Sequence, residues 1–152
     1  WIKGIEGTIN STFRIIKSVI PYMEKNSSGS VINFSSIYGI ISPDPKVYEN
    51  TGFGINSPDY GAGKAAIIQL TKYAAVQYAK KGIRFNVISP GAFPNKTIQK
   101  NKKFIKNLKN KIPLGRIGNP ADLDGIIIYL SSNSSEYMTG QNIVIDGGWT
   151  LV

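Results

Sequence analysis

The stretch SPDYGAGKAA, residues 57–66, combines a helix start with two chemically useful side chains. Ser57 suits the N-cap of a helix and Pro58 suits the first helical position, so a helix is predicted to begin here. Tyr60 and Lys64 then stand four residues apart, which places both side chains on one face of that helix. An ammonium group about 4 Å from a phenol oxygen stabilises the phenolate by up to about 4 kcal/mol at an effective dielectric constant of about 20. We therefore interpret Tyr60 as a general acid and base, with Lys64 favouring its ionised form.

A Tyr-x-x-x-Lys pair also arises by chance on amphipathic helices, so the rest of the chain decides between a surface pair and a catalytic one. One rival can be excluded at once, because the segment from Gly61 to Lys64 resembles the end of a phosphate-binding loop only superficially. Pro58 replaces the first glycine of such a loop, and Ala65 replaces the Ser or Thr that would bind Mg²⁺.

Composition is that of one globular domain. The chain has 152 residues, of which 41% are hydrophobic, and it contains no Cys and no His. This length is enough to bury a core, and disulfides are impossible. No apolar run is long enough to span a membrane and no signal peptide is recognisable, so we expect a cytoplasmic protein without a membrane partner. No metal site is predicted.

The charge is strongly positive, with 18 Lys and Arg against 9 Asp and Glu, and seven lysines fall between Lys96 and Lys111. Arginine is scarce and no aromatic residues alternate with these lysines, so nucleic-acid binding ranks last among the functions considered. The cluster is interpreted either as a solvated helix face or as part of a substrate lid. In the second case it would attract an anionic substrate, such as a phosphorylated or nucleotide-linked sugar.

Hydrophobic periodicity predicts that helices and strands alternate along the chain. Helices are expected over 1–23, 58–81, 98–110 and 120–130, and strands over 30–36, 83–88 and 142–146. This order predicts an α/β fold with a parallel sheet and helices on its faces. Ligands of such sheets bind beyond the carboxyl ends of the strands, where Ser36 and Pro90 fall. The long loop over 37–57 is expected to be functional.

Five motifs follow one another along the chain from residue 36 to residue 148. They are Ser36-Ile37-Tyr38-Gly39, Tyr60-x-x-x-Lys64, Asn86-Val87-Ile88-Ser89-Pro90-Gly91, Pro113-Leu114-Gly115-Arg116 with Pro120-Ala121-Asp122, and Gly140-Gln141 with Asp146-Gly147-Gly148. Together they resemble the short-chain dehydrogenase/reductase family, and the resemblance covers nearly the whole chain.

The resemblance implies the C-terminal half of a Rossmann-like doubly wound parallel sheet, as one domain over residues 1–152. The dinucleotide-binding half is absent, because Gly4 and Gly7 lie inside the first helix with no strand before them. It further implies an oxidoreductase that uses NAD or NADP to interconvert a secondary alcohol and a carbonyl. The isolated chain is expected to be inactive, and a homo-oligomer built through the two long helices is expected.

The family also implies roles for single residues. Ser36 would hold the substrate oxygen, Tyr60 would exchange the proton, and Lys64 would also bind the nicotinamide ribose beside Tyr60. The nicotinamide itself would lie against Pro90, Gly91 and Phe93.

Three departures from the family pattern stand out. Thr8 occupies the position of the active-site Asn, and Asn95 that of a nicotinamide-contacting Thr. Ser36 and Tyr60 are 24 residues apart, and the segment between them includes an insertion with Tyr38, Tyr48 and Phe53, whose rings either contact substrate or merely pin the loop. The insertion more weakly resembles that of oxidoreductases of bacterial flagellin modification and sugar biosynthesis. The alternative function is that of a non-catalytic binding protein that resembles the short-chain dehydrogenases/reductases.

Overall fold

Three parallel strands form the centre of the molecule in the computed structural model, which describes residues 1–152. The strands are β1 (Gly29–Phe34), β2 (Ile83–Pro90) and β3 (Asn142–Ile145), in the spatial order β1-β2-β3. Gly29 pairs with Ile83, and Val87 pairs with Asn142. The predicted α/β fold with a parallel sheet is confirmed.

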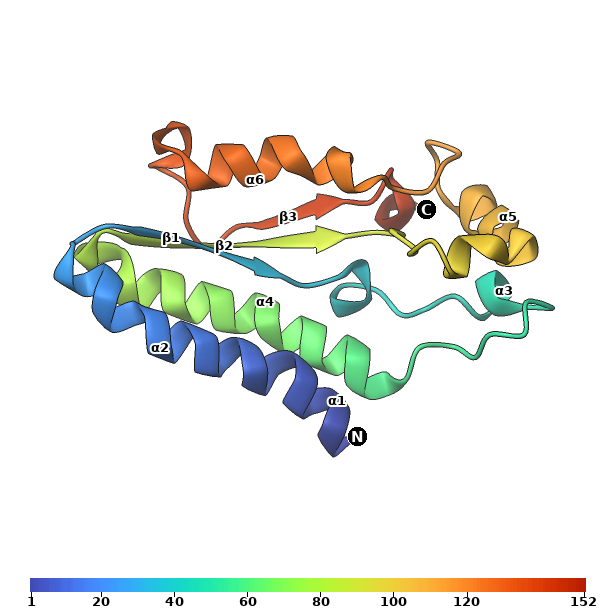
Figure 1. Cartoon of the computed structure of the whole chain (residues 1–152), viewed down its shortest axis with the longest axis horizontal. Coiled ribbons are helices and arrows are strands. Elements are labelled where there is room, and N and C mark those ends of the chain that lie inside the picture. Colours follow the sequence, from blue (N-terminus) through green and yellow to red (C-terminus); the bar gives the residue numbers. More distant parts are fainter.

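Helices cover both faces of this sheet (Figure 1). One face carries α1 (Ile2–Ile5), a π-helical turn (Glu6–Asn10), α2 (Ser11–Lys25) and α4 (Pro58–Tyr78), and the opposite face carries α6 (Asp124–Ser131). Helix α4 begins where the sequence predicts, with Ser57 in an extended conformation and Pro58 in the first turn. It continues as a 3₁₀ turn (Ala79–Lys81) and stops at Gly82, whose φ of 73° suits a glycine.

Most of the remaining short helices gather beyond the carboxyl ends of the strands (Figure 1). They are α3 (Pro45–Tyr48), α5 (Lys102–Lys111), and 3₁₀ turns over Ile37–Gly39, Ile98–Lys100, Pro120–Leu123 and Trp149–Leu151. The 3₁₀ turn Asn133–Ser135 instead follows α6 at the end of the sheet where the strands begin (Figure 1). The strand expected over 30–36 is shorter than predicted. It ends at Phe34, because the Ser36 hydroxyl oxygen accepts the Tyr38 N–H and starts a 3₁₀ turn there.

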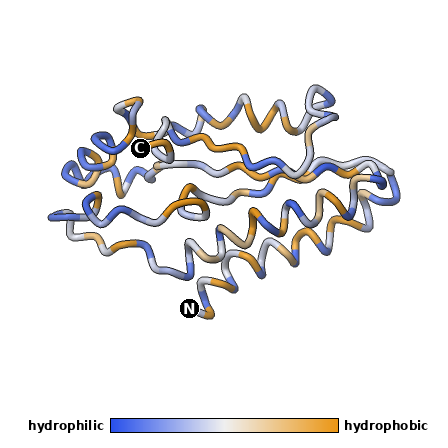
Figure 2. The backbone as a smooth tube through the Cα atoms, turned by 180° about the vertical axis from the view of Figure 1, so that it is seen from behind, coloured by the Kyte–Doolittle hydropathy of each residue, from blue (hydrophilic) through white to orange (hydrophobic).

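Two buried hydrophobic clusters hold the layers together. The first joins α2, α4 and β2 through Ile16, Ile20, Ala74, Ala75, Ile83 and Phe85. The second lies at the other end of the molecule and contains Ile37, Val47, Tyr48, Leu108, Ile112 and Trp149. Hydrophobic residues accordingly recur along the helices as well as in the strands (Figure 2). No helix is both long enough and apolar enough to cross a membrane.

Two polar residues of the middle strand are buried and fully bonded. The Asn86 side chain donates to the Met138 carbonyl at 2.9 Å and accepts the Gln141 N–H at 3.0 Å. The Ser89 hydroxyl donates to Asn142 Oδ1 at 2.6 Å. Because unpaired buried polar groups are costly, these bonds fix the chain leading into β3, and both residues of the Asn86–Gly91 motif have a structural role.

Candidate active site

A cavity of about 420 Å³ opens beyond the carboxyl ends of the strands. Of the residues expected to form the site, Ser36, Tyr60, Gly91 and Phe93 line it. Ser36 comes from the end of β1, Tyr60 from the first turn of α4, and the other two follow β2. Pro90 and Lys64 do not line this cavity: Pro90 is the last residue of β2, and Lys64 lies one helical turn beyond Tyr60.

Two glycines allow the end of β1 to approach α4 closely. A Cβ on Gly39 would lie 2.8 Å from the backbone at Lys64 and Ala65, and a Cβ on Gly61 would lie 2.9 Å from the Tyr38 carbonyl oxygen. The Ser35 hydroxyl donates to the Lys64 carbonyl at 2.7 Å across the same contact. This packing brings the serine at the strand end to the same cavity as the tyrosine of the helix.

The Lys64 ammonium has a defined position beside Tyr60. Its Nζ donates to the Phe34 carbonyl at 3.0 Å and lies 5.7 Å from the centroid of the Tyr60 ring. The hydrogen-bond partner is thus the end of β1, while the positive charge stays next to the aromatic ring. Burial lowers the pKa of Lys64 below its ordinary value. An ammonium group has three donors, so two remain for other partners.

Thr8 lies in the π-helical turn Glu6–Asn10, where the family pattern would have its asparagine. Its carbonyl oxygen accepts the Thr12 hydroxyl at 2.9 Å. The single hydrogen of the Ser11 hydroxyl is shared between this oxygen at 2.9 Å and the Gly7 carbonyl oxygen at 3.0 Å. A Cβ on Gly63 would lie 1.9 Å from the Thr8 hydroxyl oxygen, so Thr8 packs closely on α4. In this conformation Thr8 has a packing role.

The segment 37–57 is joined to α5 by contacts that the sequence did not reveal. Three side chains make polar contacts between them: Asn101 Nδ2 donates to the Thr51 carbonyl at 2.6 Å, Asn107 Nδ2 donates to the Val47 carbonyl at 3.0 Å and to the Glu49 carbonyl at 3.3 Å, and Lys111 Nζ lies 3.4 Å from the Asp44 carboxylate. The Phe104 ring lies against both Tyr48 and Phe53, with centroid separations of 5.5 and 5.1 Å. We call the segment 37–57 together with α5 the clasp, and it forms one wall of the cavity.

The cavity has an apolar part and a polar part. The apolar part includes Ile37, Phe53, Phe93, Ile98, Phe104, Leu108 and Trp149, and the polar part includes Ser36, Tyr38, Tyr48, Asn56 and Tyr60. The three aromatic residues of the insertion, Tyr38, Tyr48 and Phe53, all line the cavity. Tyr48 belongs to the second buried cluster, Tyr38 packs against that cluster and Phe53 lies against Phe104, so the rings hold the loop in place. Their contact with substrate stays a prediction.

None of the seven clustered lysines lines this cavity. Lys102, Lys106 and Lys109 instead border a shallow depression on the outer side of α5, and all three are exposed. Phe104 and Leu108 face the cavity from the same helix. The amphipathic helix α5 therefore lies between the charged lysine side chains and the cavity, so these lysines affect the cavity only through long-range electrostatics.

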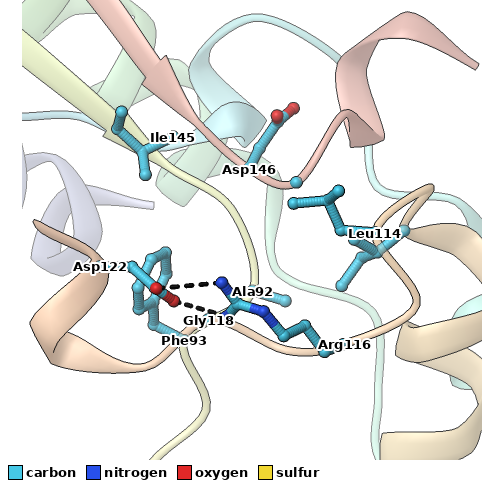
Figure 3. A pocket seen from close by; sticks show the side chains of 10 residues that line it. Ala92, Phe93, Leu114, Arg116, Gly118, Asp122, Ile145 and Asp146 are labelled. Carbon is cyan, nitrogen blue, oxygen red and sulfur yellow. Dashed lines mark hydrogen bonds and ion pairs between the residues drawn. The ribbon is translucent and has the colours of Figure 1, made fainter.

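A second, smaller pocket of about 240 Å³ lies beside the first, and Ala92 and Phe93 line both. Figure 3 shows the Asp122 carboxylate and the Arg116 guanidinium facing each other near Phe93. They form two hydrogen bonds, at 2.6 and 3.0 Å. The Arg116 guanidinium and the Asn119 N–H lower the pKa of the Asp122 carboxyl to about 2. The Pro113–Asp122 motifs therefore fix the turn that supports Phe93, a role their sequence alone did not indicate.

The protein is an α/β protein, with a parallel sheet and helices on both faces of it. Its candidate active site contains a strand-end serine and a helical Tyr-Lys pair. The family model described as enoyl-(acyl carrier protein) reductase matches residues 1–150. The 3-oxoacyl-[acyl-carrier-protein] reductase FabG of Thermotoga maritima is 36% identical over 152 residues, which are 99% of this chain and 57% of that protein. The chain belongs to the short-chain dehydrogenase/reductase family.

Other relatives differ in the substrates that their names give. The 2-keto-3-deoxy-L-fuconate dehydrogenase of Xanthomonas campestris is 30% identical, and the match covers 99% of this chain and 49% of that one. A short chain dehydrogenase from Leptospira borgpetersenii, solved with bound NAD⁺, has a TM-score of 0.81 and 40% identity, over 93% of this chain and 53% of that one. A gluconate 5-dehydrogenase from Burkholderia cenocepacia, in complex with NADP and tartrate, has a TM-score of 0.81 and 27% identity, over 92% of this chain and 52% of that one. The chain spans about half the length of the relatives it matches.

Proposed function

We propose that this protein is an NAD- or NADP-dependent oxidoreductase that interconverts a secondary alcohol and a carbonyl. The observation that carries the proposal is the convergence of Ser36 and Tyr60 on one cavity, with the Lys64 ammonium held beside the Tyr60 ring. A nicotinamide, when bound, supplies or takes up the hydride. The chain's own residues hold the substrate oxygen and exchange its proton.

Each side chain has the donor or acceptor that its role needs. The Ser36 oxygen already accepts the Tyr38 N–H, so its own hydroxyl hydrogen is free to bind the substrate oxygen. The Tyr60 hydroxyl gives that oxygen a proton in reduction and accepts it in oxidation. Lys64 uses one N–H for the Phe34 carbonyl, and its remaining donors suit the hydroxyls of a ribose.

The residues present suit the nicotinamide end of the cofactor. Gly91 and Phe93 line the cavity next to Tyr60, and Pro90 ends the strand that leads to them. We assign Tyr60, Lys64, Pro90, Gly91 and Phe93 to this end. Residues 1–152 contain no Gly-rich strand-to-helix turn for the pyrophosphate, so we expect this chain alone to be inactive and assign activity to the protein at its natural length.

For the substrate we propose a sugar or nucleotide-sugar of cell-surface or flagellin glycan biosynthesis, including anionic derivatives that the lysines of α5 would attract from a distance. Support comes from the hydroxyl groups of the cavity and from relatives named for sugar acids. The flagellin part rests on the sequence resemblance alone, and no relative reported above supports it. The competing function, a non-catalytic binding protein, is favoured by Thr8, which replaces the family's asparagine and whose carbonyl oxygen already accepts the Thr12 hydroxyl within the helix.

We further infer that the protein forms a homo-oligomer through α2 and α4. Large apolar side chains remain exposed on these helices: Phe13, Ile15, Tyr22, Tyr73 and Val76. Apolar surface of this kind is stabilised when a second copy covers it.

The test is Tyr60→Phe in the protein at its natural length, assayed with NADH and NADPH on a panel of ketones, keto-sugars and nucleotide-linked keto-sugars. Loss of the hydroxyl should lower kcat by about 10² to 10⁴ because it removes general acid catalysis. Tyr137→Phe is the matched control, since this tyrosine is fully exposed and away from the cavity. Activity of Tyr60→Phe within tenfold of wild type would contradict the role. Cofactor binding by the wild type without turnover of any panel member would favour the non-catalytic alternative.

A further inference from the structure

Three polar side chains of the insertion form a hydrogen-bonded chain along one wall of the cavity. The Tyr38 and Tyr48 hydroxyl oxygens are 3.0 Å apart, and the Tyr48 hydroxyl donates to Asn56 Oδ1 at 2.8 Å. All three residues line the same cavity as Ser36 and Tyr60.

The direction of this chain follows from counting hydrogens. Tyr48 gives its single hydroxyl hydrogen to Asn56, so Tyr38 must donate to Tyr48. The Tyr38 oxygen then keeps its lone pairs, and the Asn56 amide keeps two N–H groups, because none of these atoms has another hydrogen-bond partner in the chain. An acceptor and a donor group are therefore both available at this wall.

The two phenols are suited to fixed hydrogen bonding. Burial raises the pKa of Tyr38 and, to a lesser degree, that of Tyr48, so both stay neutral at physiological pH. The Trp149 ring meets the Tyr38 ring edge-on at 6.3 Å, and Phe104 lies against Tyr48 at 5.5 Å. Rings held in this way lose little entropy when a ligand binds.

We propose that Tyr38, Tyr48 and Asn56 select substrates that carry a second hydroxyl group in addition to the reacting one, which makes diols and hydroxy-ketones the favoured class. The second hydroxyl donates to the Tyr38 oxygen and accepts an N–H from Asn56. A substrate with only alkyl groups there would leave these polar groups without partners, and such mismatches cost affinity. The assignment of the reacting carbon rests on the proposed function, but the binding preference does not.

Binding separates this inference from the proposed reaction. Isothermal titration calorimetry would compare cis-1,2-cyclohexanediol with cyclohexanol on the protein at its natural length, without cofactor, with NAD and with NADP. One additional hydrogen bond corresponds to an affinity for the diol about threefold to tenfold higher than for the mono-alcohol. Turnover is measured separately, so an inactive protein that still prefers the diol would refute the proposed function and support this inference.

Three variants locate the preference. Tyr48→Phe removes the middle hydroxyl of the hydrogen-bonded chain, and Asn56→Ala removes the amide at its end, on an exposed residue. In both variants the affinities for cis-1,2-cyclohexanediol and cyclohexanol should lie within about twofold of each other, whereas Tyr137→Phe should keep the wild-type ratio of these affinities. Thermal unfolding confirms that each variant is folded. Three results would each overturn the inference. The wild type could bind the diol and the mono-alcohol with equal affinity, or bind neither measurably with or without cofactor. Folded Asn56→Ala could also keep the wild-type ratio of the two affinities.

Discussion

Gly39 tests whether close packing between the end of β1 and α4 builds the site. A Cβ at this position would lie 2.8 Å from Ala65 N, the Lys64 carbonyl carbon and the Ser35 hydroxyl. Two of these atoms belong to the backbone of a long helix and cannot move aside alone. Gly39 is not among the glycines with positive φ, so an alanine meets no backbone strain and its cost is steric. Overpacking of this kind costs about 1–3 kcal/mol.

For a chain of 152 residues that cost corresponds to a fall in Tm of about 2–12 °C for Gly39→Ala, followed by circular dichroism. Gly125→Ala is the matched control, because a Cβ at Gly125 in α6 would meet nothing within 4 Å. It should stabilise the fold by about 0.4–1 kcal/mol through a smaller unfolded-state entropy. A Tm for Gly39→Ala within about 1 °C of wild type, or equal losses in both variants, would refute the packing argument.

Three further results are expected. Lys64→Ala should weaken NADH or NADPH binding about tenfold to hundredfold as well as lowering the rate; an unchanged Kd in fluorescence titration would show that Lys64 does not reach the ribose. The pKa of Asp122 is lowered from 3.8 to about 2, so the stability it adds is complete above pH 3.8 and disappears as the pH falls towards 2. The Tm difference between wild type and Asp122→Asn should narrow over that range, and a constant difference would contradict the pairing with Arg116. Val76→Glu should reduce the assembly mass measured by light scattering, whereas a 16.6 kDa wild-type monomer would argue against assembly.

Local signals predicted much of this structure from the sequence. The two ends of α4 depend on residues that are neighbours in the chain, so Ser57, Pro58 and Gly82 could be assigned without tertiary information, although the Ser57 side chain makes no capping hydrogen bond. The place of Ser36 followed from topology, because the ends of parallel strands meet at one edge of a sheet, and Tyr60 was found by its spacing to Lys64. Ser36 and Tyr60 indeed line one cavity.

Contacts between distant segments could not be predicted in the same way. The carbonyl of Phe34 as a partner of Lys64 depends on how closely α4 approaches β1, which two glycines decide. The amide contacts of Asn101 and Asn107 have no periodicity, and an asparagine in such a stretch is equally typical of a solvated surface. The π-helical turn that contains Thr8 is also not revealed by residue spacing.

The clasp has a consequence for protein engineering and for evolution. Its two parts are about 50 residues apart in the chain, yet they are in close contact. Asn101 and Asn107 donate hydrogen bonds to backbone carbonyls of the segment 37–57, and the Phe104 ring packs against the rings of Tyr48 and Phe53. Grafting residues 37–57 alone onto a relative would leave those carbonyls and rings without partners. Transfer of this binding wall therefore requires α5 as well, and the two segments are expected to have been gained and lost together.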